Sequence, residues 1–432
     1  MLDFIKRQPA VRIIAFGFAA VILLGSLLLS LPISVRDGVE LNYIDALYTS
    51  TSAVCVTGLI SVDPYDTFTP AGQFFLALLM QVGGLGVTAV GAGIILLMGR
   101  KMDLKSRNLV REGMNFSSGR GVIHFIRDVF ITTLVFEIIG AVLSFIVFIR
   151  DFPFWRALGV SAFHSIAAFN NSGFDIIGGF QSLTAYKDNI FLNLLTAALI
   201  FFGGIGFLVI KDILTHKFKW KKYSMHTRVV LSVSAVLTVL GTILLKITED
   251  MSWLGAFFNS VTARTAGFAT FPLGGFTNAG LLVMIVLMII GASPGSTGGG
   301  IKTSTLFVLL HGVKSAATNK SEHAFHYAIP KDAFKKAAVI TLIALTVIVS
   351  ATFLMAALEP ELSLSDILFE MTSAFGTVGL STGITPTLGM GAKLVSIFVM
   401  YIGRLGPWTI ITLWYFSRGE RISYPEGNIA IG

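Results

Sequence analysis

The chain has 432 residues, of which 54% are hydrophobic and only 13% are charged. Soluble domains carry roughly 25% charged residues, so this composition excludes a soluble enzyme and indicates a membrane protein. A formal net charge of +8 would suggest nucleic-acid binding in a soluble chain. Here membrane topology explains the charge better, and we expect no nucleic-acid partner. The single cysteine, Cys55, excludes an internal disulfide.

Long apolar segments recur along the chain, and runs of about 20 such residues are read as membrane helices. We count eight, at about 11–31, 71–98, 123–149, 190–210, 227–247, 279–310, 335–358 and 392–416. They form four outer–inner pairs. The first lacks a small-residue cleavage site and is therefore predicted to be a retained span.

Each pair encloses one segment that is too short to cross a bilayer. These four segments lie at about 42–53, 156–168, 252–263 and 364–374. Short helices at membrane depth are tolerated where they line a protein-enclosed or wet cavity. The sequence therefore predicts an all-α polytopic protein, built from four outer helix–pore loop–inner helix repeats around one central ion pore.

Basic residues concentrate on one side of the predicted helices. Of 32 Lys and Arg residues, 24 lie before the first helix, in 100–127, 211–228 and 302–336, or after 416. Cytoplasmic loops are enriched in Lys and Arg, so both termini are predicted to be cytoplasmic. Anionic lipid or a cytosolic partner can bind the basic cluster at 217–222, although topology alone explains it. Acidic residues in the opposite loops either concentrate cations at the pore mouth or keep these loops soluble.

Four segments that follow the predicted pore helices end in nearly the same way. They read SAVCVTGL (52–59), AAFNNSGF (167–174), TARTAGF (262–268) and SAFGTVGL (373–380). Their glycines are separated by 115, 94 and 112 residues. A period near 100 residues indicates fourfold duplication of a membrane unit. We predict repeats at 1–98, 99–222, 223–320 and 321–432.

These glycine segments are predicted to form the selectivity filter. Glycine adopts backbone angles that other residues avoid, and four loops around one axis can hold a bare cation with carbonyl oxygens. Asp or Glu rings are typical of other cation channels, but no carboxylate lies in these loops, which favours a weakly hydrated monovalent ion. Any one loop could be a simple turn; four copies in matching context argue against that reading. The predicted ion-contacting residues are Val56, Thr57, Gly58, Asn171, Ser172, Gly173, Thr265, Ala266, Gly267, Thr377, Val378 and Gly379.

Each predicted inner helix carries a glycine, and in the third repeat that glycine opens an irregular segment. The four glycines are Gly83, Gly203, Gly291 and Gly403. Glycines let helices pack closely or bend, and packing alone explains the first two. The third copy reads GASPGSTGGGIKT (291–303), which cannot remain a regular helix. We predict a gate loop below the filter, with candidate gate residues Gly291, Ser293, Gly295, Ser296, Thr297, Gly298, Gly299, Gly300 and Lys302.

The same loop superficially resembles a nucleotide-binding P-loop. That motif needs Gly directly before Lys, whereas Ile301 separates Gly300 from Lys302, and no strand precedes the loop. Nucleotide binding by this segment is therefore excluded.

Arg404 replaces the second glycine in the fourth inner helix. A charge at membrane depth is costly and is by default a functional-site hypothesis. We predict that Arg404 bonds the carbonyls of the loop and repels cations; a salt bridge to Glu137 is the alternative. Arg264 and Glu370 lie in neighbouring pore helices, where buried charges need partners, so we predict mutual or local scaffolding of the filter.

These motifs together resemble the Trk/Ktr/HKT superfamily of potassium translocators. The resemblance rests on VTGL (56–59), FNNSGF (169–174), ARTAGF (263–268), SPGSTGGGIKT (293–303) and Arg404, in this order, and covers about residues 10–416. The chain begins just before its first repeat, which is similar to the KtrB-type membrane subunit of bacterial Ktr systems.

The resemblance implies a homodimer with one pore per protomer, resting on a cytosolic ring of nucleotide-binding KtrA-type subunits that gates it. It also implies uptake that is often stimulated by Na⁺. In the plant branch a Ser at the first filter glycine accompanies Na⁺ selectivity, and Gly58 at this position favours K⁺. No covalently bound cofactor is expected.

The sequence thus predicts a channel-like K⁺ uptake subunit of a bacterial plasma membrane, and not an enzyme. Two alternatives remain open. One is a Na⁺-conducting member of the same fold. The other is a secondary cation symporter, which would usually show inverted repeats and a coupling carboxylate or His near the midplane; here only Glu137 is available.

Overall fold

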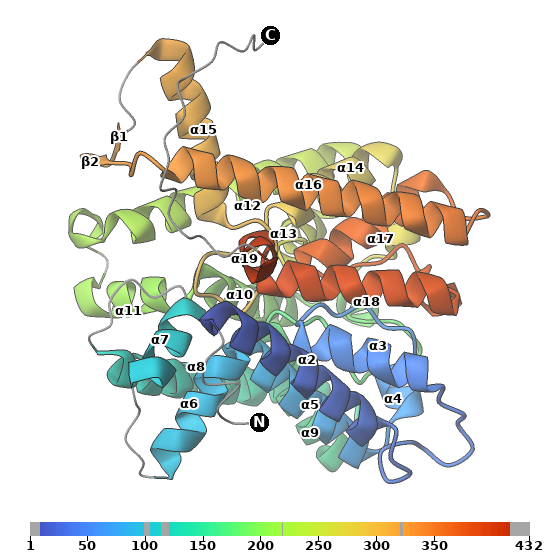
Figure 1. The fold of residues 1–432 in the computed structure, drawn as a ribbon. Coiled ribbons are helices and arrows are strands. Elements are labelled where there is room, and N and C mark those ends of the chain that lie inside the picture. Colours follow the sequence, from blue (N-terminus) through green and yellow to red (C-terminus); the bar gives the residue numbers. More distant parts are fainter. Residues whose placement is uncertain (1–8, 99–103, 114–120, 218, 320–322, 415–432) are drawn as a thin grey trace.

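The structure is a computed structural model that describes residues 9–98, 104–113, 121–217, 219–319 and 323–414. Its regular elements are almost all helices, as the sequence predicts. Two-residue strands β1 (His323–Ala324) and β2 (Tyr327–Ala328) form a small antiparallel pair, in which His323 lies opposite Ala328. Figure 1 shows long helices side by side across the view, with α6, α11 and α15 on its left.

Each repeat contains one long outer helix. These helices are α2 (Ala10–Leu29), α8 (Val122–Phe148), α12 (Met225–Thr248) and α16 (Ala333–Leu358). All four are long and apolar enough to cross a membrane. Large apolar side chains on their outer faces are exposed, among them Leu23, Ile138, Val239 and Phe353. Apolar patches of this kind are rare on surfaces that face water, so these faces are suited to contact with lipid.

A short helix follows each outer helix and ends at a predicted filter segment. These pore helices are α3 (Tyr43–Val54), α9 (Phe154–Phe169), α13 (Trp253–Thr262) and α17 (Leu364–Gly376). Their bounds agree with the predicted short segments to within a few residues. At 10 to 16 residues, they are too short to span a bilayer.

One contact between outer helix and pore helix recurs in the first three repeats. A serine of the pore helix donates to an outer-helix carbonyl, from Ser50 to Ile22 at 2.7 Å, from Ser165 to Glu137 at 2.7 Å and from Ser260 to Thr238 at 2.9 Å. The residue three positions after each of these carbonyls is a glycine, and a Cβ added there would overlap the serine hydroxyl. These glycines are Gly25, Gly140 and Gly241. The recurrence supports duplication of one unit.

All four inner helices are broken, where we predicted a break only in the third. The upper halves are α5 (Pro70–Leu85), α10 (Ile190–Ile205), α14 (Asn278–Ile289) and α18 (Met390–Leu405). The lower halves are α6 (Val87–Leu97), α11 (Phe207–His216), α15 (Thr303–Thr318) and α19 (Pro407–Trp414). The prediction of continuous helices at 71–98, 190–210 and 392–416 is therefore wrong.

Glycine in the left-handed region causes the three short breaks. Gly86, Gly206 and Gly406 have φ of 86°, 92° and 85°, which no right-handed helix accommodates. The halves meet at 98°, 100° and 96°. A single glycine inside an apolar run is usually tolerated in a helix, so composition alone gave no sign of these bends.

The remaining elements connect the repeats. They are α4 (Pro64–Thr67), α7 (Leu104–Gly113) and four short 3₁₀ turns, η1 (Thr184–Tyr186), η2 (Trp220–Lys222), η3 (Leu273–Gly275) and η4 (Thr385–Thr387).

A buried ion pair joins the first repeat to the fourth. Lys393 Nζ lies 2.7 Å from Asp45 Oδ1, and both side chains are about nine-tenths buried. Nearby, the hydroxyls of Tyr48 and Ser396 lie 3.0 Å apart. These contacts fasten α3 to α18 across 348 positions of sequence, so they help to close the four repeats into a ring.

Removing one partner of this pair is expected to destabilise the fold. A lone buried charge costs about 3–5 kcal/mol, so Lys393→Gln and Asp45→Asn should each lower the thermal unfolding midpoint in detergent. The double variant should lose less than the sum of the two single losses, because it leaves no unpaired charge. Additive losses would show that the two side chains do not stabilise the ring through each other.

Candidate ion pathway

The four filter glycines lie in one closed ring. Each lies against the carbonyl oxygen of the residue that precedes the next filter glycine in the chain, and the last lies against the first repeat. An added Cβ would meet these oxygens in the pairs Gly58 with Ser172, Gly173 with Ala266, Gly267 with Val378 and Gly379 with Thr57. Segments separated by about a hundred residues therefore surround a common axis in sequence order.

The backbone of the ring alternates between unusual conformations. The glycines have φ of 93°, 68°, 83° and 93°, in chain order. The residue two positions earlier is also left-handed in every repeat, with φ of 52° at Val56, 57° at Asn171, 73° at Thr265 and 50° at Thr377. Positive φ is rare for β-branched residues, and such strain persists where the surrounding structure enforces it, often at functional sites.

Backbone N–H groups of the filter segments donate hydrogen bonds to the pore helix that precedes them. Thr57 N–H donates to Ser52 O at 2.8 Å, and Gly58 N–H to Ser52 Oγ at 3.0 Å. The fourth repeat copies this, with Val378 N–H to Ser373 O at 2.9 Å and Gly379 N–H to Ser373 Oγ at 3.1 Å.

The carbonyl groups remain available. Within the described residues, no hydrogen bond is made to the carbonyl oxygens of Thr57, Ser172, Ala266 or Val378. The pore helices end just before the ring, so their C-terminal partial negative charges lie next to it. Both features favour a cation on the axis.

Inner-helix glycines fit against the ends of the pore helices. An added Cβ would overlap Val54 O at Gly83, Phe169 O at Gly203 and Phe375 O at Gly403. Close packing therefore accounts for these three glycines. The third copy differs, because Gly291 lies against Gly299 O within the gate loop.

The loop predicted at 291–303 lies between α14 and α15, at 290–302, and backbone hydrogen bonds connect it to the second repeat. Ser293 N–H donates to Gly204 O at 3.0 Å, Phe207 N–H to Gly295 O at 3.1 Å, and Thr297 N–H to Gly203 O at 3.3 Å. At its base, Gly291 N–H donates to Ile301 O at 2.8 Å. An irregular segment with unpaired amides would be costly at membrane depth, and these bonds remove much of that cost.

Two cationic side chains donate to carbonyl groups of this loop, Arg404 from α18 and Lys302 from the end of the loop itself. The Arg404 guanidinium donates to Thr297 O of the loop, and to Gly83 O and Gly84 O of α5, the last at 3.2 Å. Lys302 Nζ donates to Gly298 O at 2.7 Å and to Gly299 O at 3.3 Å. The predicted contact of Arg404 with loop carbonyls is therefore present.

The considered salt bridge between Arg404 and Glu137 is not formed among the described residues. Glu137 instead accepts from Gln81 Nε2 at 3.2 Å and from Asn170 Nδ2 at 3.0 Å. This buried polar cluster lies behind the second filter segment, and sequence reasoning did not find its two amide partners.

Arg264 and Glu370 do not pair with each other. Arg264 donates to Ser234 Oγ at 3.2 Å, and Glu370 accepts from the Thr385 hydroxyl. The predicted mutual pairing is therefore not formed. Each charged group has a hydroxyl partner within its own repeat, and local scaffolding of the filter stays a prediction.

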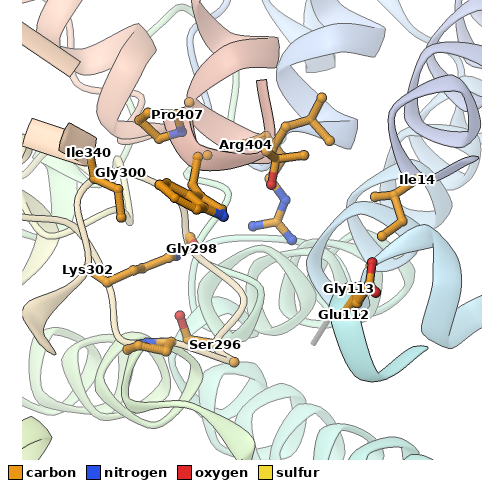
Figure 2. A pocket seen from close by; sticks show the side chains of 18 of the residues that line it. Ile14, Glu112, Gly113, Ser296, Gly298, Gly300, Lys302, Ile340, Arg404 and Pro407 are labelled. Atoms are coloured by element: carbon orange, nitrogen blue, oxygen red, sulfur yellow. Dashed lines mark hydrogen bonds between the residues drawn. The ribbon is translucent and has the colours of Figure 1, made fainter. Parts of the chain in front are cut away.

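A cavity of about 430 Å³ lies directly below the gate loop. Figure 2 shows Arg404 and Lys302 pointing into it from opposite sides, with Glu112 beyond. The first turns of α6, α15 and α19 contribute Thr88, Ser304 and Trp408 to the lining. Helix N-termini carry partial positive charge. Together with Lys302, Lys336 and Arg404 they outweigh Glu112, the one carboxylate among the lining residues, so the lining disfavours cations in this conformation.

The sequence matches a known protein family. The sequence profile of the TrkH family, described as a cation transport protein, matches residues 13–240 and 228–418. The chain belongs to this family. The predicted resemblance to the Trk/Ktr/HKT superfamily is thereby confirmed, and the protein is a multi-pass membrane protein of the cation transporter class.

Curated relatives match over nearly the whole length. The chain is 38% identical over 445 residues to the potassium/sodium uptake protein NtpJ of Enterococcus hirae, covering 99% of this chain and 98% of that protein. It is 34% identical to the Ktr system potassium uptake protein B of Bacillus subtilis, covering 100% and 98%. The solved potassium transporter TrkH of Vibrio parahaemolyticus, at 18% identity, has a TM-score of 0.74 over 95% of this chain and 86% of that one, which confirms the fold.

Proposed function

We propose that this protein is the ion-translocating subunit of a Ktr-type K⁺ uptake system. The observation that carries the proposal is the closed ring of filter glycines, each set against the carbonyl of the next repeat. A ring of carbonyl oxygens replaces the hydration shell of a monovalent cation. Relatives that match over the full length are named as potassium uptake proteins, and no chemical step is part of the mechanism.

In this mechanism the twelve predicted filter residues line the path and the four repeats, with the boundaries given above, surround it. Ions move inward along the membrane potential, which supplies about 2.3 kcal/mol per charge for each 100 mV. The loop at 291–303, held by Arg404 and Lys302, closes the path below the filter.

The proposed setting is a bacterial plasma membrane with both termini cytoplasmic. A cytosolic ring of nucleotide-binding KtrA-type subunits gates the pore, and Na⁺ stimulates uptake. Support for this setting comes from the distribution of Lys and Arg and from relatives named as Ktr system proteins.

Uptake complementation in cells that lack K⁺ transport tests the proposal. The chain should restore growth at low K⁺, and co-expression of a regulatory subunit should increase uptake. Failure to restore growth at low K⁺, although the protein is present in the membrane, would contradict the proposal.

A Na⁺-conducting protein is the second candidate function. The relative from Enterococcus hirae is named a potassium/sodium uptake protein, so Na⁺ must be measured as a competitor. We expect K⁺ to be preferred over Na⁺, since Gly58 keeps the first filter position free of a side chain. A secondary symporter is less favoured. The coupling carboxylate that the sequence suggests, Glu137, is bonded by two amides behind the filter, and the buried Glu370 accepts from the Thr385 hydroxyl.

The proposed assembly is a homodimer that forms through the inner-helix ends and the segment 404–432. Residues 415–432 of this segment lie outside the described residues. Mass measurement in mild detergent should give twice the mass of one chain. Monomers alone, in detergent and in membrane crosslinking, would contradict the assembly.

A further inference from the structure

The upper side of the gate loop contacts the lower end of the filter. Gly299 N–H donates to Thr377 Oγ1 at 2.9 Å. Gly298 lies so close to Thr265 Oγ1 that an added Cβ would overlap it. Both threonines are fully buried. Filter and gate are therefore one bonded unit in this conformation, not two separate layers.

The two threonines occupy equivalent positions in their repeats. Each lies two residues before its filter glycine and has a left-handed backbone, as Asn171 does in the second repeat. The Asn171 amide lies 3.1 Å from Thr265 Oγ1. Three of the four repeats thus place a polar side chain at the bottom of the ring, and Val56 is the apolar exception.

Such oxygens are suitable ligands for a dehydrated monovalent cation. A threonine hydroxyl has two lone pairs, but the Thr377 oxygen faces the partial positive charge of the Gly299 amide. A cation at the same oxygen would be repelled by that amide, because both partners need the negative end of the hydroxyl dipole.

We propose that the closed loop and the lowest cation of the filter compete for the Thr377 hydroxyl. This inference rests on the proposed function and gives Thr377, one of the twelve predicted filter residues, a second role as the acceptor of the closed loop. Closing the loop removes a ligand from the lowest ion site, and an ion in that site weakens the closed loop. By linkage the two effects are equal in size, so K⁺ itself favours opening.

Four variants separate the roles at this contact. Thr377→Val keeps the shape but has no oxygen, whereas Thr377→Ser keeps the oxygen. Gly299→Ala places a methyl group against Thr377 Oγ1 and Cγ2 and 3.1 Å from Gly403 O, and Gly299 does not have positive φ, so the variant disrupts the contact without a backbone-strain cost. Gly91→Ala is the matched control, since nothing lies within 4 Å of an added Cβ there.

The readouts are K⁺ flux without a regulator and the Na⁺/K⁺ competition ratio. An unpaired buried amide changes an equilibrium by about tenfold or more, so Gly299→Ala and Thr377→Val should each raise flux about tenfold. Only Thr377→Val should also lose about tenfold in K⁺ preference, a change of about 1.4 kcal/mol, because it alone removes the oxygen that the proposal places at the lowest ion site. Thr377→Ser should resemble the wild type in both.

The outcomes distinguish this inference from the proposed function. If wild type and Gly91→Ala carry K⁺ but Thr377→Val keeps the wild-type K⁺ preference, the competition is wrong and the function stands. If neither wild type nor Gly91→Ala carries K⁺, the proposed function fails and this inference fails with it.

A second measurement does not depend on flux. Ser296 lines the cavity, and Cys55 is fully buried, so Ser296→Cys supplies an accessible thiol on the loop. K⁺ should accelerate its modification relative to choline, and adding Thr377→Val should abolish that acceleration. A modification rate that K⁺ leaves unchanged with Thr377 intact would overturn the proposal.

Discussion

Replacement of Arg404 by alanine is expected to raise K⁺ flux in the absence of a regulator by at least about tenfold, since charge-assisted hydrogen bonds are each worth about 1.5–3 kcal/mol. The guanidinium holds Thr297 of the loop against Gly83 and Gly84 of α5. Its loss releases the loop and removes a positive charge from the cavity. The measurement is K⁺ uptake with and without the regulatory subunit.

Two further variants control this prediction. Arg404→Lys keeps the charge but not the planar fork, so it should give an intermediate flux. Deletion of Gly298–Gly300 removes the acceptors of Lys302 and the donor to Thr377, and should match Arg404→Ala. K⁺ preference should change little in all three, because the filter residues are retained. Folded variants with unchanged or lower flux would show that the loop is structural and not a gate.

Replacement of Gly58 by serine is expected to reduce the preference for K⁺ over Na⁺ by about tenfold or more. The new Cβ would overlap Ser172 O, which displaces a carbonyl of the ring. A tenfold change in preference corresponds to about 1.4 kcal/mol. Ion-competition uptake measures the change.

Gly383→Ala is the matched control for this effect. Gly383 has a φ of 104° but no atom within 4 Å of an added Cβ, so it carries the backbone cost without the clash. We expect normal K⁺ preference in this variant. An equal loss in both variants would assign the effect of Gly58→Ser to general strain and not to the ring.

Repetition made the filter predictable from sequence. Four glycine segments at similar spacing identified the pore helices and the ring, and five glycines with one proline identified the loop at 291–303. These signals are local, because they depend on backbone conformations that few residues other than glycine adopt.

Contacts between distant residues were not predictable in the same way. Nothing in the sequence around Asp45 indicates a partner, yet Asp45 pairs with Lys393, which is 348 positions away. Gly86, Gly206 and Gly406 bend the inner helices because the folded protein holds them at positive φ, whereas their sequence surroundings remain apolar and helical. The partners of Glu137 and Arg404 likewise depend on which side-chain amides and backbone carbonyls the fold brings near them.

The most direct test of the central claim is anomalous scattering from crystals of this protein grown in Rb⁺. The account predicts Rb⁺ peaks on the ring axis, within contact of the carbonyl oxygens of Thr57, Ser172, Ala266 and Val378. A ring without Rb⁺, together with an ordered peak at a carboxylate such as Glu137, would contradict carbonyl coordination and favour the symporter alternative.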